Sequence, residues 1–257
     1  NVKMGAATQT ALGETLDGLE DEGVEAVFLA GDMTDKGTHA QYEALAATTR
    51  SRALTVYGCM GNHDSETPTS RADALGVCGH LFPEGSTDHV VGKPPLRVIV
   101  FDGAYWRTKE GAYLDHRTPE TTVNTAKPDQ IEWLRQTLAE DTVTPTLFVW
   151  HFPLSGRQGP SSSGFKQRGW RFCGEALKEL EAAPNVVGTL CGHTHWNEAG
   201  HSQGMTHLIN AAFSEWPNSY RVFRVYPDRI GSSGRCARCT TGGSFVSPSW
   251  SRKPCRG

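Results

Sequence analysis

Short apolar runs alternate along this chain with longer segments in which apolar residues recur every three or four positions. Strand-like runs occupy 25–30, 53–60, 96–102, 145–150 and 185–191, and helix-like segments occupy 10–23, 39–50, 128–141 and 171–183. In the clearest helix, Pro128 stands in the first turn, and Ile131, Leu134 and Leu138 share one face. Strands that alternate with helices predict an α/β fold with a sheet that is at least partly parallel.

The remaining segments carry weaker patterns. Residues 206–214 and 220–227 predict a closing antiparallel pair of strands, whereas 65–95 and 103–127 show no motif and are expected to be loops over the functional crevice. We expect one domain over residues 1–230 and a disordered, Gly-, Ser- and Arg-rich tail over 231–257. The tail contains Cys236, Cys239 and Cys255, but no fourth ligand follows, so disorder is favoured over a zinc site.

Composition narrows the possible functions. The chain is 37% hydrophobic and 21% charged with a formal net charge of −3, which is typical of a soluble globular protein. The sequence contains no cluster of basic residues that would indicate a nucleic-acid-binding face. Its apolar runs are all shorter than the roughly 18 residues of a membrane-spanning helix. The seven scattered cysteines and the lack of a secretory leader favour a cytoplasmic location. The oligomeric state is not indicated.

Ligand-type residues follow four of the apolar runs, each at the carboxyl end. They are Asp32, Asn62, His63, His151, His193 and His195. Because the functional crevice of an open α/β sheet lies outside the carboxyl ends of its strands, we expect these residues to converge. Imidazole, carboxylate and amide donors without sulfur suit a transition metal such as manganese, iron or zinc rather than a structural thiolate zinc site.

The order of these motifs carries a family resemblance. GDMTDKG at 31–37, GNHD at 61–64, the lone His151 and GHTH at 192–195 together resemble the calcineurin-like metallophosphoesterase superfamily. The finer pattern of the first motif resembles the cyclic-nucleotide phosphodiesterase-like branch. The resemblance implies a sandwich of two packed mixed β-sheets flanked by helices, with a dinuclear metal site. It also implies hydrolysis of a small phosphate ester, with a nucleotide as one candidate.

The resemblance implies a role for each residue. Asp32 would bridge two metals, Asn62, His151 and His193 would complete the second metal's shell, and His195 would bind the first metal. A metal-held hydroxide would attack the phosphorus. His63, which would contact the substrate together with Asn62, would donate a proton to the leaving alkoxide or stabilise its charge. Asp35 would pair with His63 and orient it. Lys36 would be a solvated lysine or, less favoured, a phosphate contact.

The family's first motif, D-x-H at the end of the first strand, has no counterpart before Asp32. The first histidine is His39, and Asp17 and Asp21 lie in the first predicted helix. Either the segment exists upstream in the natural protein, which we favour, or the protein lacks it. The chain as given offers the first metal only Asp32 and His195. We therefore expect one well-formed metal site, with the first strand of the fold absent.

These features predict a metal-dependent phosphodiesterase, with two alternatives left open. One is a phosphomonoesterase, and the other is a catalytically impaired metallophosphoesterase-like domain that binds a partner. Asp64 is expected to cap a loop, and Asp102 is a strand-end residue that could contact substrate. The six histidines without a motif are expected at the surface or in loops: His39, His80, His89, His116, His201 and His207.

Overall fold

The computed structural model describes residues 6–93, 95–153, 174–215, 218–237, 245–246 and 250–251. This part of the chain is a mixed α/β fold with several packed sheets and five α-helices. The helices are α1 (Ala6–Asp21), α2 (His39–Thr49), α3 (Ser70–Val77), α4 (Pro128–Glu140) and α5 (Gly174–Ala182). All four predicted helices are confirmed, and α3 is an addition.

The largest sheet has six strands in the order β10-β11-β9-β8-β4-β3. Its strands are β3 (His89–Lys93), β4 (Leu96–Phe101), β8 (Thr146–Trp150), β9 (Val186–Cys191), β10 (Glu198–Ser202) and β11 (Met205–Ile209). The four central strands, β11, β9, β8 and β4, run parallel, and the two edge strands are antiparallel to their neighbours. The predicted partly parallel sheet is therefore confirmed.

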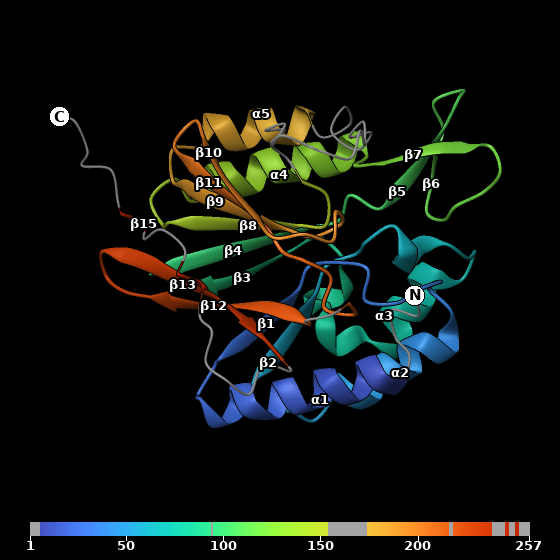
Figure 1. Cartoon of the computed structure of the whole chain (residues 1–257). Coiled ribbons are helices and arrows are strands. Elements are labelled where there is room, and N and C mark those ends of the chain that lie inside the picture. Colours follow the sequence, from blue (N-terminus) through green and yellow to red (C-terminus); the bar gives the residue numbers. More distant parts are fainter. Residues whose placement is uncertain are drawn as a thin grey trace, which may run out of the picture.

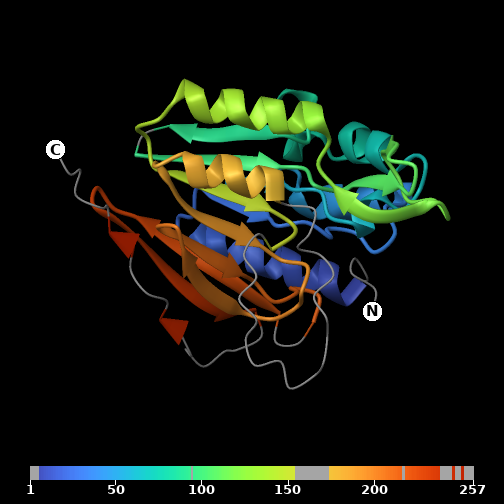
Figure 2. The same cartoon turned by 90° about the horizontal axis from the view of Figure 1, so that it is seen from above.

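Both faces of this sheet are buried, and side chains alternate between them with the period of two expected of a strand. In β8, Phe148 and Trp150 pack with Leu134 of α4 and Leu180 of α5. Leu147 lies on the opposite face, in a second apolar cluster between the sheets. Figure 1 shows α4 and α5 on one side of the sheet, and Figure 2 shows the two helices side by side over it.

The second layer of strands comprises two small sheets. Strands β1 (Ala26–Leu29) and β2 (Thr55–Gly58) pair in parallel, and β12 (Ser219–Val225) pairs antiparallel with β13 (Arg229–Cys236). Helices α1 and α2 cover the outer side, where Leu16 and Leu45 are fully buried in a third apolar cluster. The order helix, sheet, sheet, helix confirms the predicted fold class.

An apolar cavity of about 940 Å³ lies between β1 and β12. Its walls include Leu12 and Leu16 of α1 and Val149 of the six-stranded sheet, and its polar end reaches Asp32 and His151. In the described part of the chain, β1 pairs with β2 alone, and all four of its apolar residues stay partly exposed. The first described element is α1, and none of the described strands precedes it in the sequence.

Three predictions about weakly patterned regions are wrong. Residues 65–95 contain α3 and β3, and 103–127 contain a three-stranded sheet instead of a loop. That sheet has the order β6-β5-β7, from β5 (Tyr105–Thr108), β6 (Tyr113–Leu114) and β7 (Thr121–Thr125). The expected closing pair does not form, because β11 pairs with β9 and β10 while β12 pairs with β13.

The predicted boundary at residue 230 is also wrong. Strand β13 crosses it and pairs with β12 from Ile230 to Cys236. Apolar periodicity does not predict this strand, because Ile230 is its only large apolar residue. Backbone pairing with β12 defines it instead. The short strands β14 (Phe245–Val246) and β15 (Trp250–Ser251) also pair with β13. Cys239 and Cys255, for which disorder was favoured over a zinc site, lie outside the described residues.

Two histidines expected at the surface or in loops are buried in strands. His89 in β3 is 5% exposed and His207 in β11 is 3% exposed. Burial lowers the pKa of His89 to about 4, because a charged ring would lose its hydration there, and the backbone of Ser86 and Thr87 opposes the shift only in part. None of the helices in the described ranges is long and apolar enough to cross a membrane.

Candidate active site

The predicted convergence of strand ends is confirmed, but the residues come from two sheets. Asp32 follows β1 and Asn62 follows β2 in the small parallel sheet. His151 directly follows β8, and His193 follows β9, in the six-stranded sheet. The two parallel pairs direct their carboxyl ends to the same place, so donors separated by more than a hundred residues become neighbours.

The backbone at the site adopts strained conformations that place these side chains. Asp32, His193 and His195 have φ values of 51°, 67° and 62°, in the left-handed region that non-glycine residues seldom occupy. Gly31 has φ of 83°, and a Cβ atom there would lie 2.4 Å from His151 Nδ1. Strain of about 1–3 kcal/mol per residue persists where surrounding structure enforces it, and such residues gather at functional sites.

Four side chains form a compact donor cluster, which we call the Asp32 cluster: Asp32, Asn62, His151 and His193. Ligand atoms of Asp32, His151 and His193 all lie within 4.8 Å of one another. His193 Nδ1 is 3.1 Å from Asn62 Oδ1 and 3.3 Å from His151 Nε2. The Oδ1 atom of Asp32 is 3.3 Å from His151 Nε2. Two imidazoles, a carboxylate and an amide oxygen fit a transition metal.

The protonation of His151 also fits metal binding. Its Nδ1 lies 2.9 Å from the carbonyl oxygen of Ala30, which can only accept a hydrogen bond. Nδ1 therefore carries the proton, and the unprotonated Nε2 faces Asp32 and His193. A fixed outer hydrogen bond of this kind orients most metal-binding histidines.

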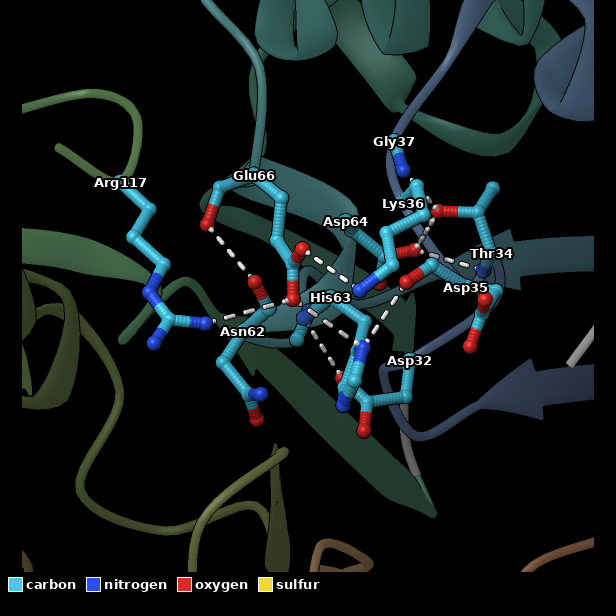
Figure 3. Close-up of polar contacts among 12 residues, drawn as sticks. Asp32, Thr34, Asp35, Lys36, Gly37, Asn62, His63, Asp64, Glu66 and Arg117 are labelled. Carbon is cyan, nitrogen blue, oxygen red and sulfur yellow. Dashed lines mark hydrogen bonds and ion pairs between the residues drawn. The ribbon is translucent and has the colours of Figure 1, made fainter. Parts of the chain in front are cut away.

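His63 lies beside the cluster and is tied to it. Its backbone N–H donates to Asp32 Oδ1 at 3.0 Å, and its side chain is 28% exposed. Figure 3 shows its ring Nδ1 facing the backbone carbonyl of Asp35, at 2.9 Å, whereas the Asp35 carboxylate points away. The predicted pairing of His63 with the Asp35 side chain is therefore wrong. The carboxylate near the ring belongs to Glu66, with Oε1 3.3 Å from Nδ1.

Glu66 joins two cations to this part of the site. Its Oε2 accepts a hydrogen bond from Lys36 Nζ at 3.0 Å, and its Oε1 lies 3.8 Å from Arg117 Nη1 (Figure 3). Lys36 is therefore paired with a carboxylate and is not simply solvated. Sequence reasoning missed Glu66 and Arg117. The sequence could have predicted the contact of Glu66 with His63, because residues three positions apart lie on the same side of a helical turn.

Asp64 performs the structural role that the sequence predicts. Its buried carboxylate accepts hydrogen bonds from the N–H groups of Met33, Thr34 and Gly61. It thereby clamps the segment after β1 to the segment after β2. Burial and the negative charge of Asp32 raise the pKa of Asp64 to about 6, and the N–H donors oppose this rise.

Asp102 is a structural residue as well. Its side chain is fully buried, pairs with Arg71 and accepts a hydrogen bond from the backbone N–H of Ala104 at 2.8 Å. Because both carboxylate oxygens are occupied inside the protein, the suggested substrate contact by Asp102 finds no support.

His195 has a different neighbour from the other donors. Its Nδ1 lies 2.9 Å from Oε1 of Glu215, and each side chain is about one third exposed. Glu215, on the segment between β11 and β12, was missed because no sequence motif marks it. Within the described ranges, the compact group of possible metal ligands contains Asp32, His151 and His193 but not His195.

Comparison with known proteins settles the family. The family model for calcineurin-like phosphoesterases matches residues 6–197, which is most of the chain. The chain belongs to the calcineurin-like phosphoesterase family. Within this family it is a phosphoric ester hydrolase, and the motifs that carried the resemblance, from Asp32 to His195, lie inside the matched residues.

Two curated relatives carry the same description. The chain is 25% identical over 233 residues to a probable cyclic nucleotide phosphodiesterase from Synechococcus sp., covering 87% of this chain and 81% of the relative. It is 31% identical over 150 residues to a probable cyclic nucleotide phosphodiesterase from Rhodococcus erythropolis, covering 56% of this chain and 44% of the relative. The second match therefore spans less than half of that relative's length.

Solved structures share the fold at low identity. A dimetal phosphatase from Danio rerio superposes with a TM-score of 0.69 at 16% identity, covering 95% of this chain and 88% of its own. GAP50, described as the anchor in the inner membrane complex of Plasmodium, superposes with a TM-score of 0.64 at 12% identity, covering 94% of this chain and 84% of its own. The same architecture thus occurs in proteins described as a phosphatase and as an anchor.

Proposed function

We propose that this protein is a metal-dependent phosphodiesterase that hydrolyses a cyclic nucleotide or another small phosphate diester. The observation that supports this proposal most directly is the hydrogen bond from the His63 backbone N–H to Asp32 Oδ1. This bond fixes His63, the candidate proton donor, beside the Asp32 cluster. The curated relatives described as probable cyclic nucleotide phosphodiesterases support the substrate class.

The residues of the Asp32 cluster would hold the metal. When bound, a metal of this kind supplies Lewis-acid polarisation of a phosphoryl oxygen and lowers the pKa of a water ligand. Asp32 contributes the negative charge, His151 presents Nε2, and His193 presents Nδ1 beside the amide oxygen of Asn62. Which of manganese, iron or zinc binds stays open in this proposal, as does the second metal that the sequence resemblance implies.

His63 would act on the leaving group. Its Nδ1 faces the Asp35 carbonyl and the Glu66 carboxylate, both of which accept hydrogen bonds, so the proton stays on Nδ1. That leaves Nε2 as the atom that exchanges a proton with the leaving alkoxide. A well-placed acid of this kind contributes about 10²–10⁴-fold to the rate.

Two nearby cations would contact the phosphate. Lys36 and Arg117 are held on the same Glu66 carboxylate, next to the His63 ring. Their charges favour an anionic substrate at this side of His63. The predicted cytoplasmic location stays a prediction.

The test is hydrolysis of bis-p-nitrophenyl phosphate and of p-nitrophenyl phosphate with added manganese. We expect the diester to be preferred, and His63→Ala to lower its turnover by about 10²–10⁴-fold. His201→Ala, at an exposed histidine of β10, is the matched control and should retain wild-type turnover. Preference for the monoester would replace the proposal with a phosphomonoesterase. No turnover of either ester by the folded protein would favour the partner-binding alternative.

A further inference from the structure

His195 and Glu215 form a pair that the Asp32 cluster does not use. The contact joins His195 Nδ1 to Glu215 Oε1 at 2.9 Å, across twenty residues of sequence. A carboxylate accepts hydrogen bonds and, when ionised, cannot donate one. The ring therefore donates from Nδ1, which leaves the lone pair on Nε2.

The segment that carries Glu215 is fixed at both ends. At its start, the Asn210 backbone N–H donates to the Cys191 carbonyl at 2.8 Å, and the Asn210 side-chain Nδ2 donates to the Ser219 carbonyl at 3.2 Å. At its end, the Asn218 N–H donates to the Glu215 carbonyl at 2.6 Å. Asn218 has φ of 60°, a conformation that asparagine tolerates better than most residues. Glu215 is thus presented by an anchored turn.

His151 shows the same arrangement with a different acceptor. Its Nδ1 donates to the Ala30 carbonyl at 2.9 Å, and its Nε2 faces the Asp32 carboxylate. His193 has two neighbours at the same nitrogen, because its Nδ1 lies 3.1 Å from Asn62 Oδ1 and 3.3 Å from His151 Nε2. The holding group of His151 is thus a backbone carbonyl, whereas that of His195 is a charged side chain.

We infer that Glu215 is a positioning residue for His195, which keeps the proton on Nδ1 and so makes Nε2 the metal-binding atom. The inference rests on the proposed function for the presence of a metal site, and on the sequence resemblance for the binding of a second metal by His195. A carboxylate behind a ligating imidazole fixes the ring orientation and raises the basicity of the free nitrogen, and its loss typically costs 10–100-fold in metal affinity.

The first test needs no metal and no substrate. Long-range ¹H–¹⁵N spectra of histidine-labelled protein at mildly alkaline pH report the tautomer of each ring, and His195→Ala identifies the His195 signals. We expect the Nδ1–H form in the wild type and a shift toward the Nε2–H form in Glu215→Ala. Glu198→Gln is the matched control, because this nearby carboxylate accepts from the Trp196 indole N–H instead. An unchanged His195 tautomer in Glu215→Ala would overturn the inference.

The second readout is manganese binding. We expect Glu215→Ala to weaken the looser of the binding steps by about 10–100-fold and to leave the tight step at the Asp32 cluster unchanged. Equal weakening of both steps would show a general structural effect and would contradict a specific role at His195. Absence of hydrolysis in the wild type would end the proposed function, but it would not change either readout, so the two failures are distinguishable.

Discussion

The Asp32 cluster and the His195–Glu215 pair both lie where strands of the sheets end. The two regions differ in how many possible metal ligands they bring together. In the cluster, ligand atoms of Asp32, His151 and His193 lie within 4.8 Å of one another, and Asn62 adds an amide oxygen. His195 instead directs Nδ1 to one carboxylate, and both side chains are about a third exposed. A site needs several converging donors to hold a metal tightly, so the cluster should bind well and the His195 side weakly.

The largest expected effect comes from Asp32→Asn, which removes the cluster's only carboxylate. We expect tight manganese binding to disappear and diester turnover to fall by more than the 10–100-fold typical of changes outside the ligand shell. Loss of this charge should leave the fold intact, because it relieves the repulsion that raises the pKa of Asp64. Calorimetric manganese titration together with a thermal melt checks both points. A variant that still binds manganese tightly would contradict the assignment of Asp32.

His151→Ala and His195→Ala test the comparison directly. The first substitution removes a donor of the cluster and should abolish tight manganese binding. The second removes a donor outside it and should leave the tight step within a few-fold of wild type while eliminating any looser step. The same titration measures both variants. If His195→Ala were as damaging as His151→Ala, the two regions would form one site and the distinction would fail.

The sequence predicted the donors of the cluster because each stands immediately after an apolar strand. The positions of Asp32, Asn62, His151 and His193 therefore followed from local motifs. Glu66 and Glu215 did not, since their contacts with His63 and His195 depend on how separate segments pack. The Asp35 prediction named the right residue but the wrong group, because a motif does not say whether a carbonyl or a carboxylate faces the ring.

The fold shows the same division. Strands with apolar runs, such as β8, were predicted, whereas β13 depends on its ladder with β12 and contains one large apolar residue. His89 was expected at the surface or in a loop because no motif marks it, yet pairing of β3 with β4 buries it. Pairing between strands determines both the presence of β13 and the burial of His89, and local residue patterns do not reveal which strands pair.

The buried His89 allows a prediction about pH that distinguishes unfolding of the protein at acidic pH from protonation of the metal-binding residues. Its folded-state pKa is lowered to about 4 from 6.5, so the folded state favours the neutral ring. Its contribution to stability is fully present above pH 6.5 and is lost as the pH falls toward 4. The shift corresponds to about 3 kcal/mol of unfolding free energy.

Replacing His89 with leucine should flatten this part of the stability profile, measured by urea unfolding at several pH values. Metal loss at acidic pH should persist in the variant, because the donors of the cluster are unchanged. An equally steep stability profile in His89→Leu would show that other groups cause the acid sensitivity.

The smallest expected effects concern two glycines. Gly31→Ala should destabilise the protein by at least about 2 kcal/mol, because φ of 83° strains any side chain and the new Cβ would collide with the His151 ring. Gly18→Ala, in α1 with no atom within 4 Å of the new Cβ, is the matched control and should stabilise the protein by about 0.5–1 kcal/mol. Urea unfolding measures both. Equal stabilities would refute the close approach of Gly31 to His151.

The central claim is that this chain holds one metal ion tightly, at the Asp32 cluster. The most direct measurement is a manganese titration of the metal-free protein, with the stoichiometry checked by elemental analysis after extensive dialysis. We predict one retained ion per chain, lost in His151→Ala and kept in His195→Ala. Two tightly retained ions per wild-type chain would contradict the account, because the His195 side would then be as complete as the cluster.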